Sequence, residues 1–248
     1  MGSEMCIRDR INDARAQGVS VWADQYPYGA SGTGLSAALV PGWAQEGGRD
    51  VLAARLQNPE QRALIRKEMV ENMVRRAGPN AMLLRSDDPA LDGKRLDEVA
   101  KERLQDPIDT AIDILIKGGA GIVSFNMNEN DIEALMKQPW MMTSSDGALP
   151  KFGEGQEHPR AYGAYPRKLR RYVLERKVIG MEQAIHSSSG LPAQVFAIPD
   201  RGVLKVGAFA DVLVFNPETI RDVATYEKPH AYSCLLYTSP SPRDGLLS

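Results

Sequence analysis

Short apolar segments alternate with amphipathic stretches along most of this 248-residue chain, and this alternation constrains the fold more than any other feature. The apolar segments are too short for typical helices, and turn residues bound them, as is usual for buried strands. Strands that are repeatedly separated by helices favour a parallel sheet or a (β/α) barrel over an all-β fold or a helix bundle. The sequence therefore predicts an α/β protein.

Turn and cap residues divide the chain into expected elements. We expect helices over residues 11–17, 59–76, 96–104, 108–116, 128–136 (or from 130), 167–176 and 181–187, and another beginning at 191. We expect strands over residues 19–23, 81–84, 121–125 and 140–142, and a loop over residues 29–34. Ile65, Met69 and Met73 form one stripe of the long helix, which predicts core packing rather than a cofactor site.

The C-terminal part of the chain has a different pattern. Residues 202–216 contain two short β segments around a turn at Gly207. Such an appendage is typical of a small β-domain that accompanies a barrel. Asp211 lies next to the second segment, where it suits a structural turn.

The two ends of the chain are related to each other through DNA. One coding sequence for residues 2–9 has a reverse complement that encodes Leu-Leu-Tyr-Thr-Ser-Pro-Ser, the sequence of residues 235–241. This relation resembles an inverted adapter of the kind used in sequencing libraries. We therefore expect residues 1–10 and 234–248 to be adapter-derived, and exclude them from the fold prediction. The biological segment is expected to run from about Ile11 to Ser233, with truncation open at both ends.

Composition narrows the classes of function. Both cysteines, Cys6 and Cys234, lie in the flanks, so no disulfide framework or thiolate metal site is predicted. The formal net charge of -2 argues against a nucleic acid or an anionic membrane as the main partner. No apolar run approaches the length of a membrane span. We expect a soluble protein with a cytoplasmic location, and its oligomeric state stays open.

Residues 140–167 hold the densest group of candidate functional side chains. The apolar run at 140–142 leads into the turn Thr143-Ser144-Ser145-Asp146-Gly147. This turn would present Asp146 at the carboxyl end of a strand, where barrel enzymes carry their catalytic groups. The following loop contains His158-Pro159-Arg160. By themselves, these residues also suit simpler roles, because Asp146 can form a turn or cap a helix and Arg160 can make a surface ion pair.

Several motifs, in the same order, resemble the C-terminal half of the N-acyl-D-amino-acid deacylase (D-aminoacylase) family of the amidohydrolase superfamily. These motifs are Asp24-Gln25-Tyr26-Pro27-Tyr28 with Ser31 and Thr33, Asn126-Met127-Asn128-Glu129-Asn130-Asp131, Ser145-Asp146-Gly147, His158-Pro159-Arg160, Leu191-Pro192-Ala193 and Ala210-Asp211-Val212-Leu213-Val214-Phe215. The resemblance implies a partial (β/α) metal-dependent hydrolase barrel over residues 11–190. It also implies a segment that enters a small C-terminal β-sandwich portion over residues 191–233.

The resemblance further implies an activity and roles for three residues. The expected reaction is hydrolysis of the amide of a small-molecule N-acyl-D-amino acid, which releases the D-amino acid. Zinc or another divalent metal would lower the pKa of a bound water to about 7. Asp146 matches the catalytic aspartate, a general base and then a general acid, and is also a candidate metal ligand. Arg160 matches the arginine that binds the substrate α-carboxylate, and Tyr28 matches a substrate-binding tyrosine at the active-site rim. For Tyr28, packing beside Pro27 is the simpler reading.

The remaining metal ligands are not among these motifs. The resemblance places a His-x-His pair and further histidines upstream of Ile11, and His158, His186 and His230 show no ligand spacing. The chain alone is therefore expected to lack a complete metal centre and to be inactive. Two alternatives stay open. One is a cyclic-amide hydrolase of the hydantoinase or dihydroorotase type, and the other is a degenerate amidohydrolase domain without catalytic activity.

Overall fold

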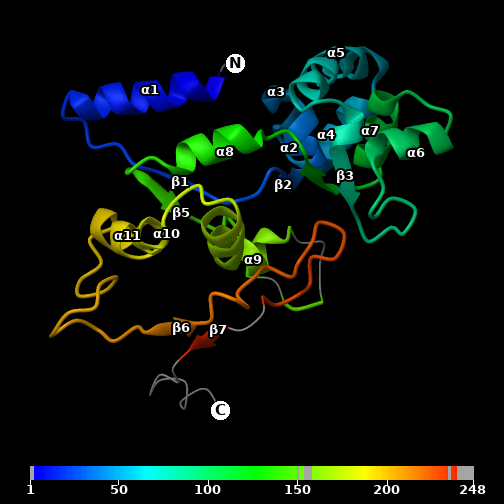
Figure 1. Ribbon diagram of the computed structural model, residues 1–248. Coiled ribbons are helices and arrows are strands. Elements are labelled where there is room, and N and C mark those ends of the chain that lie inside the picture. Colours follow the sequence, from blue (N-terminus) through cyan, green and yellow to red (C-terminus); the bar gives the residue numbers. More distant parts are fainter. Residues whose placement is uncertain (1–2, 150, 154–157, 234–235, 239–248) are drawn as a thin grey trace. The chain divides into compact units, whose positions relative to one another are not determined.

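The computed structural model describes residues 3–149, 151–153, 158–233 and 236–238, which form two compact units (Figure 1). Unit 1 combines the described parts of Met1–Tyr28, Asn128–Leu149 and Pro159–Ser248, and unit 2 combines those of Gly29–Met127 and Pro150–His158. Each unit has its own hydrophobic core. No described helix has the length and apolar character needed to cross a membrane.

Unit 1 contains the strand pair that carries the candidate site. The strands β1 (Ala23–Gln25) and β5 (Met141–Thr143) are parallel, and Ala23 pairs with Met141 while Gln25 pairs with Thr143 (Figure 1). The helices of this unit are α1 (Ser3–Ala16), α8 (Glu129–Met136), α9 (Arg160–Arg167), the π-helix η2 (Lys168–Glu175), α10 (Met181–Ser188) and α11 (Gly190–Val195). One core cluster joins α8, η2 and α10 through buried residues that include Ile132, Tyr172 and Ala184.

The junction of α9 and η2 follows from one proline. Pro166 lies inside α9 and has no backbone N–H, so it cannot donate to the Tyr162 carbonyl one turn earlier. The hydroxyl of Ser233 donates to that carbonyl instead, at 2.7 Å. Directly after this break the backbone continues as a π-helix, a form that is rare and frequent at functional sites.

Unit 2 is built on the three-stranded antiparallel sheet β2-β4-β3. Its strands are β2 (Ser31–Gly34), β3 (Met82–Arg85) and β4 (Gly121–Ser124), and its helices are α2 (Leu35–Leu39), α3 (Gly42–Gln45), α4 (Arg49–Gln57), α5 (Pro59–Arg75), η1 (Pro79–Ala81), α6 (Leu96–Glu102) and α7 (Pro107–Ile116). Met82, Leu84 and Ile122 of the sheet join the helices in one core cluster.

The sequence determines α5 locally. The Asn58 side chain accepts hydrogen bonds from the backbone N–H groups of Glu60 at 3.1 Å and Gln61 at 3.0 Å, and Pro59 occupies the first helical turn. The stripe of Ile65, Met69 and Met73 is buried in the core of unit 2. The structure therefore confirms the predicted helix and its packing face.

Four sequence-based expectations differ from the structure. Residues 29–34 were expected to form a loop, but Ser31–Gly34 is β2, because pairing with β4 outweighs the low strand propensity of glycine. The parallel arrangement holds for β1 and β5, whereas β2, β4 and β3 are antiparallel. The strand expected at 19–23 begins at Ala23, and the helix expected from Arg167 begins at Arg160.

The C-terminal β segments also differ from the prediction. Gly207 lies in a turn with φ of 87°, as expected, but the residues on its N-terminal side do not form a strand. Instead β6 (Leu213–Phe215) pairs with β7 (Leu236–Thr238), which falls in the segment expected to be adapter-derived. The helix α1 likewise begins at Ser3, inside the N-terminal flank. The partial barrel and the small C-terminal β-sandwich portion stay predictions.

Lys168 gives unit 1 a testable dependence on pH. Burial lowers the pKa of Lys168 to about 8. Between pH 8 and the ordinary lysine pKa of 10.5, the unfolded chain holds a proton on this amine that the folded chain has lost, so the free energy of unfolding rises with pH. At about 1.4 kcal/mol per pKa unit, the rise is on the order of 3 kcal/mol. Urea denaturation across this range should show the free energy of unfolding of the wild type rising relative to that of Lys168→Met. Buried Tyr28, whose raised pKa acts in the opposite sense as the pH approaches the ordinary tyrosine value of 10.0, is present in both chains and cancels in the difference.

The exposed Lys137 provides a matched control. Lys137→Met removes the same charge without removing a buried amine, so it should keep the wild-type slope. A Lys168→Met variant with an unchanged slope would show that this amine does not titrate as its burial requires.

Candidate active site

The carboxyl ends of β1 and β5 meet at one edge of the strand pair. The strands are parallel and in register, so the chain leaves β1 at Tyr26 and β5 at Ser144 on the same side. The backbone N–H of Ser144 donates to the Gln25 carbonyl at 3.1 Å, which extends the pairing beyond the strands. This edge is where enzymes with parallel strands carry their catalytic residues.

Thr143, the last residue of β5, is fixed by side chains from the following helices. Its hydroxyl accepts hydrogen bonds from the Lys168 ammonium at 2.5 Å and from the Ser188 hydroxyl at 2.9 Å. The Lys168 ammonium also donates to the Ser187 hydroxyl at 2.8 Å. The Tyr165 hydroxyl donates to the Thr143 carbonyl at 3.4 Å. The start of the turn that carries Asp146 is therefore held by η2, α10 and α9.

The turn after β5 has a strained backbone and lies against α9. Asp146 adopts a left-handed conformation with φ of 46°, which is uncommon for a residue with a side chain. A Cβ atom on Gly147 would lie 2.8 Å from the Cα atom and 3.1 Å from the backbone N of Ala161. Only glycine allows the turn to approach the first turn of α9 this closely. The motif Ser145-Asp146-Gly147 thus has a geometric requirement as well as a chemical one.

This close approach brings Asp146 beside Arg160. The two side chains form an ion pair with 2.9 Å between Asp146 Oδ2 and Arg160 Nη2. The Asp146 side chain is 63% exposed, whereas that of Arg160 is 11% exposed. The Arg160 guanidinium lies over the ring of Tyr26, 4.7 Å from the ring centroid. An exposed carboxylate, a guanidinium of low exposure and an aromatic ring therefore share one edge of the strand pair.

Tyr26 is a member of this group that the sequence prediction missed. Burial raises the pKa of its phenol above the ordinary value, Arg160 opposes the rise by its charge and hydrogen bond, and Asp146 adds to it. Tyr26 therefore keeps its proton at neutral pH and can donate a hydrogen bond. Its position directly after β1, a strand parallel to β5, is the signal that predicts its proximity to Asp146.

Tyr28 lies elsewhere in unit 1. Its side chain is 1% exposed, and its hydroxyl donates to the Pro159 carbonyl at 3.3 Å. The Arg167 guanidinium lies 4.6 Å from its ring centroid, and a Cβ atom on Gly163 would come within 2.7 Å of its hydroxyl oxygen. Burial, with Asp222 as a second cause, raises the pKa of Tyr28 well above its ordinary value. Tyr28 is therefore a packed core residue in this structure, and its substrate-binding role stays a prediction.

The histidines do not assemble into a ligand set. His158 belongs to unit 2, where its Nε2 lies 3.0 Å from the Ala30 carbonyl oxygen. The Nδ1 of His230 lies 3.2 Å from the Tyr162 hydroxyl in unit 1. Among the residues that the structure describes, no group of three or more His, Cys, Asp or Glu side chains is placed to hold a metal ion. Within the described candidate site, Asp146 offers a carboxylate oxygen that could bind a metal ion. One carboxylate is not enough for a metal centre, so the described residues do not form one by themselves.

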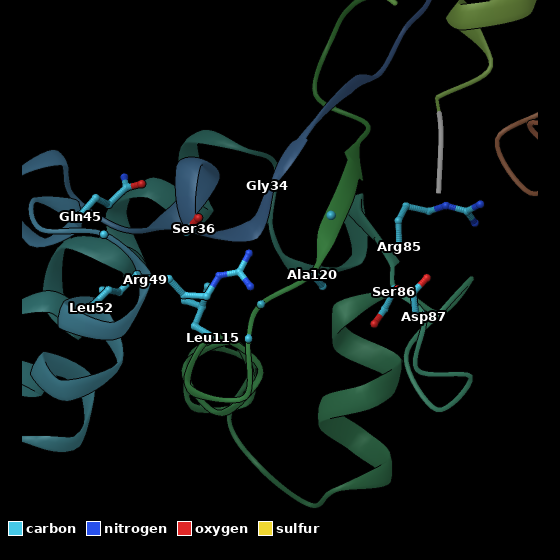
Figure 2. Close-up of a pocket in the computed structure, with 14 residues that line it drawn as sticks. Gly34, Ser36, Gln45, Arg49, Leu52, Arg85, Ser86, Asp87, Leu115 and Ala120 are labelled. Carbon is cyan, nitrogen blue, oxygen red and sulfur yellow. The ribbon is translucent and has the colours of Figure 1, made fainter. Parts of the chain in front are cut away.

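Unit 2 contains a separate cavity of about 670 Å³ between β2, α4, α7 and the segment after β3. Its lining includes two cationic side chains, Arg49 and Arg85, and one carboxylate, Asp87. Figure 2 shows the Arg49 side chain directed between Ser36 and Leu115, whereas Arg85 extends away from Arg49. The two guanidinium groups do not converge on one point, so the cavity lacks the paired donors of a carboxylate clamp.

The chain belongs to the Amidohydrolase family, whose model matches residues 38–236. It is 32% identical over 228 residues to N-acyl-D-glutamate deacylase of Alcaligenes xylosoxydans xylosoxydans, covering 92% of this chain and 38% of that protein. It is 38% identical over 141 residues to D-aminoacylase of the same organism, covering 57% of this chain and 28% of that protein. The predicted family is confirmed.

Solved structures show the same relationship. The crystal structure of N-acyl-D-glutamate deacylase from Bordetella bronchiseptica, complexed with zinc and a phosphonate inhibitor, matches with a TM-score of 0.70 and 29% identity. A D-aminoacylase structure with a binuclear metal centre matches with a TM-score of 0.69 and 27% identity. These matches cover 95% and 96% of this chain and 41% of each neighbour, so the chain spans about two fifths of the proteins it resembles.

The close contact between Gly147 and Ala161 yields a stability prediction. Gly147→Ala places a Cβ atom 2.8 Å from a backbone atom of α9, so the turn must move. Overpacking of this kind costs about 1–3 kcal/mol. Urea denaturation should show a loss of that size. The control is Gly180→Ala, because an added Cβ atom there meets nothing within 4 Å. Equal stabilities of the two variants would contradict the close packing of the turn.

Proposed function

We propose that a protein containing this chain hydrolyses N-acyl-D-amino acids and releases the free D-amino acid. The observation that carries the proposal is the joint placement of Asp146, Arg160 and Tyr26 at the carboxyl edge of β1 and β5. Support also comes from the relatives, whose names describe deacylation of N-acyl-D-glutamate and related compounds. These names describe linear amides, which favours a deacylase over a cyclic-amide hydrolase.

Arg160 and Tyr26 would bind the substrate. A guanidinium offers a planar set of donors that matches a carboxylate, and the low exposure of Arg160 strengthens such a pair. The protonated Tyr26 hydroxyl would donate a further hydrogen bond to the same carboxylate. Together they would fix the α-carboxylate and so place the neighbouring amide next to the Asp146 turn.

Asp146 would move the proton. Amide hydrolysis requires removal of a proton from the attacking water and delivery of a proton to the departing nitrogen. A carboxylate that is 63% exposed at the end of a strand can reach both positions after small side-chain rotations. We therefore assign Asp146 the role of general base and then general acid.

A divalent metal, zinc by similarity, is part of this proposal for the whole protein. The solved relatives contain zinc or a binuclear metal centre. When bound, such a metal supplies a hydroxide nucleophile at neutral pH. Asp146 would be its ligand from the described residues, and the other ligands would have to come from outside them.

The roles of Asp146 and Arg160 can be separated kinetically in a full-length protein that contains this sequence. Asp146→Asn should lower kcat by at least about 10²-fold, the scale of general acid–base catalysis. Arg160→Ala should mainly raise KM for an N-acyl-D-amino acid, and should matter much less for the analogue with an amidated carboxylate. The measurement is steady-state release of free amine from N-acetyl-D-methionine and its carboxamide. Near-normal kcat in Asp146→Asn, or equal losses on both substrates in Arg160→Ala, would refute these assignments.

The two tyrosines can be distinguished by a matched pair of variants. Tyr26→Phe removes a hydroxyl beside Arg160, so it should raise KM and leave thermal stability nearly unchanged. Tyr28→Phe removes the donor to the buried Pro159 carbonyl, so it should lower stability by about 1 kcal/mol and leave KM unchanged. Thermal denaturation and steady-state kinetics measure both effects. The opposite result would assign the substrate-binding role to Tyr28.

A further inference from the structure

The group proposed to bind the substrate carboxylate already holds a carboxylate of the protein itself. Asp146 Oδ2 lies 2.9 Å from Arg160 Nη2, at the distance of a charge-assisted hydrogen bond. The guanidinium is fixed from its other side by Tyr26, which lies under it and shares a hydrogen bond with it. Asp146 therefore occupies part of the donor set that an α-carboxylate would use.

The two partners of this ion pair differ in freedom. Arg160 is 11% exposed and belongs to the first turn of α9, so its guanidinium has little room to move. The Asp146 side chain is 63% exposed at the tip of a turn, so it can leave the guanidinium and be hydrated at small cost. When a second carboxylate approaches Arg160, repulsion between the two anions favours departure of the exposed one.

We propose that the substrate α-carboxylate displaces Asp146 from Arg160 and thereby releases it to act as the general base. This proposal rests on the proposed function and adds a determinant of specificity to it. A substrate with a free α-carboxylate both binds and frees the base. An amidated analogue lacks the competing anion and leaves Asp146 paired with Arg160. Discrimination against the amide then arises in the chemical step as well as in binding.

Competition for Arg160 can be measured on the 248-residue chain without turnover. The probe is N-acetyl-D-methionine, titrated by NMR into the chain in the presence of a metal chelator. Asp146→Asn removes the competing anion, so it should lower the Kd for the probe about fivefold, the upper range for an ion pair with one exposed partner. Arg160→Gln should abolish saturable binding of the probe, both in the wild-type chain and in the chain that also carries Asp146→Asn. The carboxamide of the probe should bind the wild type and Asp146→Asn equally.

A matched variant controls for net charge. Asp211 is 58% exposed and paired with Arg201 in the same unit, so Asp211→Asn changes the charge of the chain by the same amount. It should leave the Kd at the wild-type value. An Asp146→Asn variant that binds the probe no more tightly than Asp211→Asn would overturn the displacement proposal, while the carboxylate role of Arg160 would stand. Unchanged binding in Arg160→Gln, or no saturable binding to any variant, would overturn both.

Discussion

The hydroxyl of Thr143 is the point on which the candidate site depends. Thr143 is the last residue of β5, and its backbone pairs with Gln25 of β1. Its hydroxyl accepts hydrogen bonds from Lys168 of η2 and Ser188 of α10. A turn that begins at a residue held by three elements has a fixed origin, although its tip is exposed. This anchoring requires a buried ammonium group, which is costly to desolvate. Burial of Lys168 destabilises the fold, but its hydrogen bond fixes Thr143, the residue at which the turn that carries Asp146 begins.

The sequence predicts local features of this fold better than it predicts pairing. The helix α5 could be predicted because Asn58, Pro59 and the stripe of Ile65, Met69 and Met73 act within one segment. The strand β2 could not, because Gly32 and Gly34 disfavour a strand until β4 pairs with them. The same distinction applies to the site. Asp146 and Arg160 were found through their motifs, whereas Tyr26 joins them only through the register of two strands that are far apart in the chain.

The ion pair between Asp146 and Arg160 is chemically asymmetric. An exposed carboxylate contributes little stability through such a pair, because water and salt screen it. The guanidinium gains more, because its low exposure of 11% reduces screening of the pair by water and salt. The exposed Asp146 carboxylate thus neutralises the charge of Arg160 and can be replaced easily by another carboxylate. This arrangement supports the proposed role of Arg160 in binding a substrate carboxylate.

Two glycines explain how unit 1 brings these groups close together. Gly147 allows the Asp146 turn to lie against Ala161, and Gly163 allows Tyr28 and Asp222 to lie against α9 from another direction. In each case an added Cβ atom would come within 2.8 Å of a neighbouring atom. The helix α9 is therefore positioned by two close contacts, one at Ala161 with the Asp146 turn and one at Gly163 with the side chains of Tyr28 and Asp222. Because Arg160 begins this helix, movement of either contact would shift the guanidinium relative to Asp146. The proposed exchange of carboxylates on Arg160 depends on that distance.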